Sequence, residues 1–314
     1  MTFPLKPFEN LPFVDFMAWR RFWVWSSVAM VLATFVLLAV HGLNFGIDFV
    51  GGKLVQVQTA QPTSVATVRA AVQEAGFGSA TIQEYGAANE YLVRLPGNDP
   101  KTAPDSAEKN VVAALAGKAG GAEVRRVEFV GPQVGQELRT TGLVAVLLSF
   151  AAILVYITLR FEFRYGLGAI ASLFHDTVLT VGVMSLLSTE VTLTVLAAIM
   201  TLIGYSLNDT IVVFDRIRET RARYPNKQLT EVLNLSVNQT LGRTIMTAGT
   251  TLIVLAALFF VGGEVIHDFA LVLIVGIILG TYSSVFVASP VLLALEEYYQ
   301  RMVREDAARA AGKE

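Results

Sequence analysis

An aspartate inside an apolar segment is the residue of this sequence whose chemistry stands out. Asp209 lies in a strongly apolar segment that begins near Val191 and passes into a run of charges from Asp215 onward. An ionisable side chain in a membrane-spanning helix is energetically expensive, so it normally faces a partner or a water-filled path. The sequence therefore predicts that Asp209 either handles protons or belongs to a structural ion pair.

Arg243 is the predicted partner of Asp209. Asp209 follows Val191, the outer start of its predicted span, by 18 residues, and Arg243 precedes Val261, the outer end of the next span, by 18 residues. At the rise of an α-helix, both side chains lie about 27 Å below the outer boundary. An arginine opposite an aspartate keeps the carboxylate ionised, and its withdrawal allows the carboxylate to bind a proton. A proton switch and a static ion pair that fixes helix packing both fit this pairing.

Further polar residues lie in or near the predicted spans. Those closest to the pair, which could hold water or hydrogen-bond between helices, are Asn208, Thr210, Asn238 and Thr240. His175 and Asp176 form a second intramembrane polar site, for which a proton relay and a buried hydrogen-bonded pair both remain open. No third ligand at metal spacing accompanies them, so we expect no metal site. Asp215 lies at the membrane edge and is predicted to be mainly structural.

The composition is that of a protein that crosses a membrane several times. Of 314 residues, 54% are hydrophobic and 16% are charged, whereas soluble domains have about a quarter charged. Apolar runs of spanning length recur along the chain. The sequence therefore predicts a polytopic α-helical membrane protein with six transmembrane helices, over residues 22–40, 140–159, 166–187, 191–214, 244–261 and 269–295.

The composition and motifs also argue against several functional classes. Cysteine is absent, which excludes disulfides, thiolate metal sites and cysteine nucleophiles. No pool of lysine and arginine suggests a nucleic-acid partner. The sequence shows no Ser-His-Asp set, phosphate loop or zinc-binding helix. We therefore expect a protein that is not an enzyme and has no cofactor.

A polar region separates the first two predicted spans. Residues 42–137 alternate in hydrophobic period and contain no spanning segment. The pattern strand, helix, strand, strand, helix, strand predicts an α+β ferredoxin-like (βαββαβ) domain. The predicted strands are 53–59, 80–85, 90–95 and 122–130, and the predicted helices are 63–75 and 105–119.

Glycines mark both ends of this domain. The chain enters it through Gly46, Asp48, Gly51 and Gly52, where glycine permits unusual backbone angles. A second glycine-containing link, 131–135, returns the chain to the membrane. We predict that the first segment is a hinge, and that the two short links suit rigid-body movement of the domain.

The distribution of lysine and arginine predicts the orientation in the membrane. These residues gather at one set of helix ends, whereas the loops 188–190 and 262–268 at the other set have none. By the positive-inside rule both termini are cytoplasmic and residues 42–137 are extracytoplasmic. The predicted regions are a cytoplasmic or interfacial arm (1–21), the first helix (22–41), the external domain (42–137), helices two to six (138–295) and a cytoplasmic tail (296–314).

Three stretches of the chain resemble a known family. They are FGIDFVGG at 45–52, GYSLNDTIVVFDRIRE at 204–219 and GTYSS at 280–284. These stretches resemble the SecF branch of the SecD/SecF family of protein-export membrane proteins, within the resistance-nodulation-division superfamily. The second stretch is highly specific, and the resemblance covers nearly the whole chain.

The resemblance implies an accessory subunit of bacterial protein export in the cytoplasmic (inner) membrane. Its implied partners are SecD, the SecYEG channel, the translocating preprotein and membrane lipids, and its implied energy source is the proton motive force. By motif position, Asp209 and Arg243 match the residues that the family links to proton passage. A separate SecD chain is expected to supply another intramembrane aspartate.

Two other functions fit parts of the pattern. A proton-coupled exporter subunit for small molecules or lipids belongs to the same superfamily, but such pumps usually carry two large external loops in twelve spans. This chain has one small external region. A scaffold that only stabilises the channel complex would tolerate neutral substitutions of Asp209 and Arg243.

Overall fold

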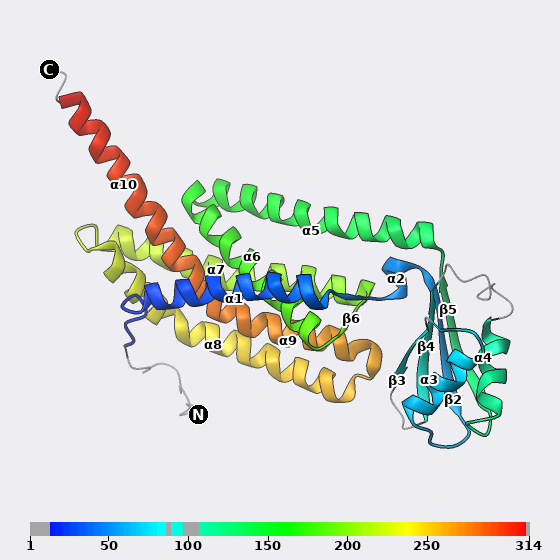
Figure 1. The fold of residues 1–314 in the computed structure, drawn as a ribbon. Coiled ribbons are helices and arrows are strands. Elements are labelled where there is room, and N and C mark those ends of the chain that lie inside the picture. The colour runs from blue at the N-terminus through cyan, green and yellow to red at the C-terminus, as the bar shows by residue number, and fades with distance from the viewer. Residues whose placement is uncertain (1–12, 79, 86–88, 97–106, 312–314) are drawn as a thin grey trace, which may run out of the picture.

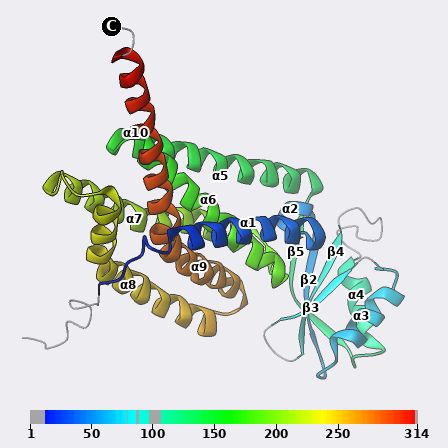
Figure 2. The same cartoon turned by 60° about the vertical axis from the view of Figure 1, so that its left-hand side comes forward.

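The protein consists of a bundle of long helices and a small α/β domain that projects beyond one end of the bundle (Figure 1). The computed structural model describes residues 13–78, 80–85, 89–96 and 107–311. The beginning of the first helix and the end of the last helix both lie at the bundle end far from the small domain (Figure 1, Figure 2). The residues predicted to form sites in the membrane, His175, Asp176, Asp209 and Arg243, all belong to helices of the bundle and not to the small domain.

Six helical segments in the described part of the chain are long and apolar enough to cross a membrane. They confirm the six predicted spans. Their bounds are α1 Arg20–His41, α5 Pro132–Arg160, α6 Phe163–Leu186, α7 Leu193–Arg223, α8 Leu229–Val261, and α9 Glu264–Ser283 with its continuation through η2 Ser284–Ala288 into α10 Ser289–Ala311.

Several of these helices extend well beyond the predicted spans: α8 begins at Leu229 and α10 runs to Ala311, and α5 and α7 are also longer than predicted. Helix α5 begins at Pro132, inside the range 42–137 that the sequence assigns to the external domain. Proline suits the first turn of a helix because its missing N–H would have no partner there. Helix α7 continues unbroken to Arg223, past the predicted end at residue 214. Hydrophobicity locates the membrane-embedded part of a helix and does not locate its solvated ends.

The last span is interrupted by the π-helical turn η2 just before Pro290. Proline lacks the N–H that would bond the carbonyl four residues earlier. The Ser289 hydroxyl donates to the Ser284 carbonyl at 3.0 Å, across the irregular turn. The irregularity therefore has a local cause in the sequence.

Helices α6, α7 and α9 form the centre of the bundle. In the apolar 18-residue stretch of each helix, 56% of the residues are buried for α6 and 44% for α7, against 11% for α1 and for α5. Small residues allow α7 and α9 to approach closely. A Cβ atom on Gly276 would lie 2.4 Å from Leu202, and one on Gly280 would lie 3.0 Å from Ser206. The outer helices leave apolar faces available to lipid or a partner.

The small domain is a four-stranded antiparallel sheet with two helices. Its strand order is β3-β4-β2-β5. Its elements follow the predicted order and are β2 Gly52–Thr59, α3 Val65–Glu74, β3 Thr81–Glu84, β4 Glu90–Pro96, α4 Ala107–Ala116 and β5 Ala122–Val130. The predicted start of the second helix, at residue 105, lies outside the described residues.

Alternating side chains build the core of this domain. Val55 and Val57 of β2 are fully buried, whereas Gln56 and Gln58 between and after them point to the other face. Both helices pack against the buried face, with Val68 of α3 among the core residues. The Ser64 hydroxyl accepts a hydrogen bond from the Thr67 N–H at 3.2 Å and so caps α3.

A junction that the sequence did not predict connects the small domain to the bundle. Strand β1 (Asn44–Phe45) pairs in parallel with β6 (Glu190–Val191), which lies between α6 and α7. A one-turn helix, α2 (Ile47–Val50), follows β1 and packs on α5. Strands of two residues are too short to produce a hydrophobic period. The predicted hinge is thus a packed segment in this structure.

Replacing Gly51 by alanine is expected to destabilise the protein by about 2–4 kcal/mol, from left-handed strain and overpacking together. Gly51 has a φ of +77°, and a Cβ atom there would lie 2.7 Å from the Pro132 Cα atom. Thermal unfolding in detergent measures the effect. Gly78→Ala is the matched control because open space surrounds Gly78. Equal stability of the two variants would contradict a tightly packed junction.

Candidate functional site

Asp209 is buried on the central helix α7. It is 3% exposed, and its Oδ2 atom has no hydrogen-bond partner among the described residues. Its neighbours about one turn away on the same helix face, Ser206 and Val213, are also buried. A buried carboxyl group without a partner destabilises a fold, so its presence calls for a functional explanation.

Arg243 does not pair with Asp209 in this structure. It lies on an exposed part of α8, and no ion pair joins the two residues within the described part of the chain. Arg243 instead lines a crevice of about 460 Å³ together with Thr240 of its own helix and with Arg160, Asp215 and Glu219 at the charged ends of α5 and α7. The structure therefore brings the predicted partners to neighbouring helices without bringing them into contact.

The position of Arg243 around the helix axis explains this separation. The buried stripe of α8 includes Val237, Thr240, Thr244 and Ala248, which recur at intervals of three or four residues. Arg243 is one residue off this stripe and so points about 100° away from Thr244. Matching depths along two helices gives the level of two side chains in the membrane and does not give their direction.

Asp215 lies at the end of the apolar part of α7. Its side chain is 52% exposed and forms ion pairs with Arg160 at 3.6 Å and with Arg218 at 3.4 Å. Exposed pairs of this kind contribute little to stability. The structure is consistent with the predicted structural role of Asp215.

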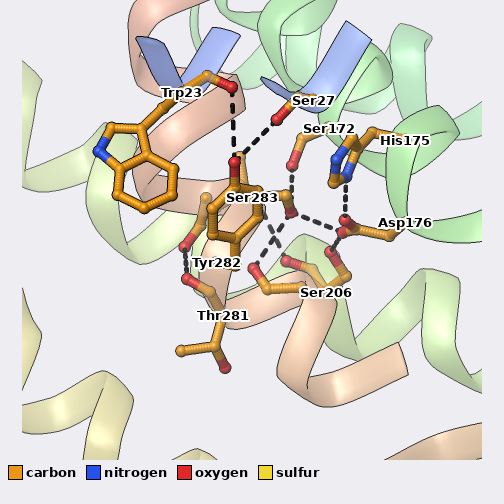
Figure 3. Close-up of polar contacts among 12 residues, drawn as sticks. Trp23, Ser27, Ser172, His175, Asp176, Ser206, Thr281, Tyr282 and Ser283 are labelled. Carbon is orange, nitrogen blue, oxygen red and sulfur yellow. Dashed lines mark hydrogen bonds and ion pairs between the residues drawn. The ribbon is translucent and has the colours of Figure 1, made fainter. Parts of the chain in front are cut away.

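His175 and Asp176 form the centre of a buried hydrogen-bond network (Figure 3). His175 Nδ1 lies 2.9 Å from Asp176 Oδ1. Oδ2 of the same carboxyl group accepts hydrogen bonds from Ser206 of α7 at 2.6 Å and from Ser283 of α9 at 2.7 Å. Asp176 is 1% exposed, and this buried carboxyl group ties three central helices together.

The network continues toward α1. Ser172 donates to Ser283 at 2.8 Å. The His175 ring stacks on Tyr282 with centroids 5.8 Å apart, and the Tyr282 hydroxyl shares a hydrogen bond with Ser27 of α1 at 2.9 Å. His175 Nε2 has no hydrogen-bond partner among the described residues. His175 and Asp176 therefore form a buried hydrogen-bonded pair, which was one of the two predicted alternatives, and this pair is part of a larger network.

Ser206 connects the network to the neighbourhood of Asp209. Its hydroxyl donates to Asp176, and its carbonyl accepts from the Thr210 hydroxyl at 3.3 Å. Asp209 follows Ser206 by three residues and so lies on the same face of α7. Two buried carboxyl groups thus flank one serine, and of these two only Asp176 is hydrogen-bonded through its Oδ2 atom.

None of the remaining predicted polar residues in the described part of the chain hydrogen-bonds to Asp209 Oδ2. Asn208 is exposed on α7. Thr240 is buried and bonds carbonyls of its own helix. Asn238, predicted as a supporting residue, instead holds the N-terminal arm: its side chain accepts from the Val14 N–H and donates to the Val14 carbonyl, each at 2.8 Å. An asparagine side chain has an acceptor oxygen and a donor NH₂ group, so it can pair with both the N–H and the carbonyl of one backbone residue. This pairing explains why an asparagine stands at position 238.

Asn234, one turn before Asn238, also holds the N-terminal arm. It accepts from the Met17 N–H at 3.1 Å and donates to the Asp15 carboxylate. The hydrogen bonds that the Asn234 side chain and the Ala18 N–H donate to the Asp15 carboxylate hold its pKa below the ordinary value. The first twelve residues of the predicted arm lie outside the described residues.

Several residues of the buried network were not predicted from the sequence to belong to a site. They are Ser27, Ser172, Ser206, Tyr282 and Ser283. Single serines are common in apolar helices, where they also bond their own backbone. A buried aspartate requires donors on neighbouring helices, and this requirement is the signal that could have identified them.

Comparison with known proteins places the chain in a family. The family model described as "Protein export membrane protein SecD/SecF, C-terminal" matches residues 110–298, and "SecD/SecF GG Motif" matches residues 36–63. The chain is 47% identical over 307 residues to "Protein translocase subunit SecF" of Magnetococcus marinus, which covers 97% of this chain and 99% of that protein. It is 44% identical over 282 residues to the protein of the same name from Vibrio alginolyticus, with 90% of each covered.

Solved structures agree with this assignment. The crystal structure of SecDF from Thermus thermophilus, called "a translocon-associated membrane protein", matches 94% of this chain with a TM-score of 0.84 and 35% identity. A SecDF structure in a "Super-membrane-facing form" matches 95% of it with a TM-score of 0.71. The chain spans 40% of the length of each of those proteins. It therefore belongs to the SecD/SecF family of protein-export membrane proteins.

Proposed function

We propose that this chain is the SecF-type accessory subunit of a bacterial protein-export machine. The observation that carries the proposal is the near full-length match, 97% of this chain and 99% of the relative, to a protein named as a translocase subunit SecF. The proposed role is non-enzymatic: the chain promotes preprotein translocation across the cytoplasmic membrane.

The proposed partners are a separate SecD-type chain, the SecYEG channel and the translocating preprotein. The matched SecDF protein carries this chain's counterpart in 40% of its length, and we assign the rest to the separate SecD-type chain. The name "translocon-associated" supports association with the channel. The apolar faces of α1 and α5, which are largely unburied in the described bundle, would contact SecD or lipid.

We propose that Asp209 binds and releases the proton that drives this work. It is buried and has no hydrogen-bond partner at Oδ2 among the described residues, unlike Asp176. Arg243 lies on the adjacent helix in a crevice of about 460 Å³ at the charged end of the bundle. A shift of α7 against α8 that brings Arg243 to Asp209 would displace the proton, because a nearby cation favours the ionised carboxylate.

We assign the small domain to the extracytoplasmic side and both termini to the cytoplasm. The bundle end that carries Arg160, Arg218 and Arg221 is the arginine-rich one, and the small domain lies at the other end (Figure 1). The element order and the strand order β3-β4-β2-β5 support a ferredoxin-like fold.

Reconstitution tests the function. The tagged chain is expected to co-purify with a SecD-type protein and the channel, and vesicles containing them are expected to translocate more preprotein when a proton gradient is imposed. Omission of this chain should remove that stimulation. Normal stimulation without the chain would contradict the proposal, and a deletion strain that is drug-sensitive with normal secretion would favour the exporter function.

A further inference from the structure

The N-terminus of α7 is held by a residue that belongs to the passage into the small domain. Asp48 Oδ2 accepts a hydrogen bond from the Leu193 N–H at 2.9 Å. Thr192, the residue before the helix, accepts a hydrogen bond from the Val195 N–H at 3.3 Å. The first N–H groups of a helix have no partner within the helix, so side-chain acceptors there fix where it begins. One of these two acceptors comes from a segment 145 residues earlier in the chain.

An ion pair makes a second connection at the same place. Arg94 of β4 pairs with Glu190 of β6, and the two side chains are only 13% and 16% exposed. Burial raises the pKa of the Glu190 carboxyl above its ordinary value, and Arg94 opposes this shift. Breaking a partly desolvated pair leaves a charge without compensation. The pair therefore ties the sheet of the small domain to the loop that leads directly into α7.

Close packing leaves little freedom between these parts. A Cβ atom on Gly46 would lie 2.7 Å from Glu190 Oε1, and one on Gly135 would lie 2.9 Å from the Gly51 backbone nitrogen. The Gly46 N–H donates to the Val191 carbonyl at 2.8 Å. The passage into the small domain is thus packed on α5 at one side and on the start of α7 at the other.

Helix α7 joins this junction to the proposed proton site without interruption. It runs as one α-helix from Leu193 to Arg223. Asp209 lies sixteen residues after Leu193, about 24 Å along the axis. Because the helix is unbroken, a rigid-body displacement of its first turn would carry Asp209 with it.

We propose that Asp48, Arg94 and Glu190 form a clamp that couples the position of the small domain to the position of α7. The segment 46–52 then acts as a mechanical link, and Asp48 is a positioning residue that acts through α7 on Asp209. This inference rests on the proposed function. Proton binding at Asp209 shifts α7, the clamp transfers that shift to the small domain, and a load on the small domain opposes it.

Two substitutions of Asp48 separate this role from proton transfer by Asp48 itself. Asparagine can accept the hydrogen bond from Leu193 but cannot carry a proton, whereas alanine can do neither. The clamp predicts that Asp48→Asn retains proton-stimulated translocation and that Asp48→Ala loses most of it. A relay through Asp48 predicts that both variants fail.

The experiment uses the full chain in complex with its SecD-type partner and the channel in vesicles. We expect Asp48→Ala to lower proton-stimulated translocation at least about fivefold, and to speed hydrogen exchange in the first turn of α7 by about five- to tenfold, as for a lost helix cap. Ser64→Ala is the matched control, since Ser64 caps α3 inside the small domain. Ser64→Ala should leave both the rate of hydrogen exchange in the first turn of α7 and the proton-stimulated translocation unchanged.

A double variant keeps the test decisive should Asp48→Ala fail to assemble. Replacing both members of the pair, Arg94→Met with Glu190→Leu, leaves no unpaired buried charge and should fold. The clamp predicts low stimulation in this double variant despite normal assembly. Full stimulation in the double variant or in Asp48→Ala, or failure of Asp48→Asn, would overturn the clamp. Absence of stimulation in the wild-type complex would instead overturn the proposed function.

Discussion

Replacing Asp209 by asparagine is expected to abolish proton-stimulated translocation while leaving the complex intact. Asparagine has nearly the shape of aspartate but cannot bind and release a proton. The Oδ2 atom has no hydrogen-bond partner among the described residues, so the amide breaks no contact at that atom. We expect the stimulated rate to fall at least about tenfold, as for the loss of a proton-transferring group. Translocation into vesicles with and without an imposed gradient measures it.

Asp215 provides the control on the same helix. Its carboxylate is half exposed and pairs with Arg160 and Arg218 near the solvent. Asp215→Asn should change the stimulated rate by less than about twofold, because exposed ion pairs contribute little. Co-purification with the SecD-type chain should be normal in both variants. Equal losses in the two variants, or a normal rate in Asp209→Asn, would contradict proton binding at Asp209.

The sequence predicted the elements of this fold better than it predicted the contacts between them. Apolar runs of spanning length located all six spans, because the bilayer requires that length. The alternation of Val55 and Val57 with Gln56 and Gln58 located a strand, because a sheet buried on one face requires it. The pairing of Asn44–Phe45 with Glu190–Val191 could not be found in this way, since it involves two residues from each of two distant segments.

The candidate site shows the same division. Asp209 and Asp176 stood out because ionisable residues are rare in spans, and both are buried. The direct pairing of Asp209 with Arg243 is not present in this structure, because a depth count ignores rotation about the helix axis. The prediction that Asn238 supports Asp209 did not consider the N-terminal arm. In the structure the Asn238 side chain pairs with the backbone of Val14 in that arm.

Leucine substitutions of the two buried aspartates are expected to change stability in opposite directions. Asp176→Leu removes the acceptor of Ser206 and Ser283 and the partner of His175. Buried donors left unpaired each cost about 1–3 kcal/mol, so we expect a loss of about 3–5 kcal/mol in total. Asp209→Leu removes an unpartnered polar atom, and we expect it to stabilise by about 1–3 kcal/mol. Unfolding of the purified protein in detergent measures both.

The conservative variant separates structure from proton transfer at Asp176. In Asp176→Asn the amide oxygen accepts from Ser206 and Ser283, and the amide N–H can donate to His175 Nδ1. We therefore expect a stability change within about 1 kcal/mol and normal proton-stimulated translocation. Loss of stimulation in a well-folded Asp176→Asn protein would contradict the structural assignment and make the network a second proton site. A stabilised Asp209→Leu protein without stimulation would show instead that the fold accepts an unpaired carboxyl group at that position for the sake of function.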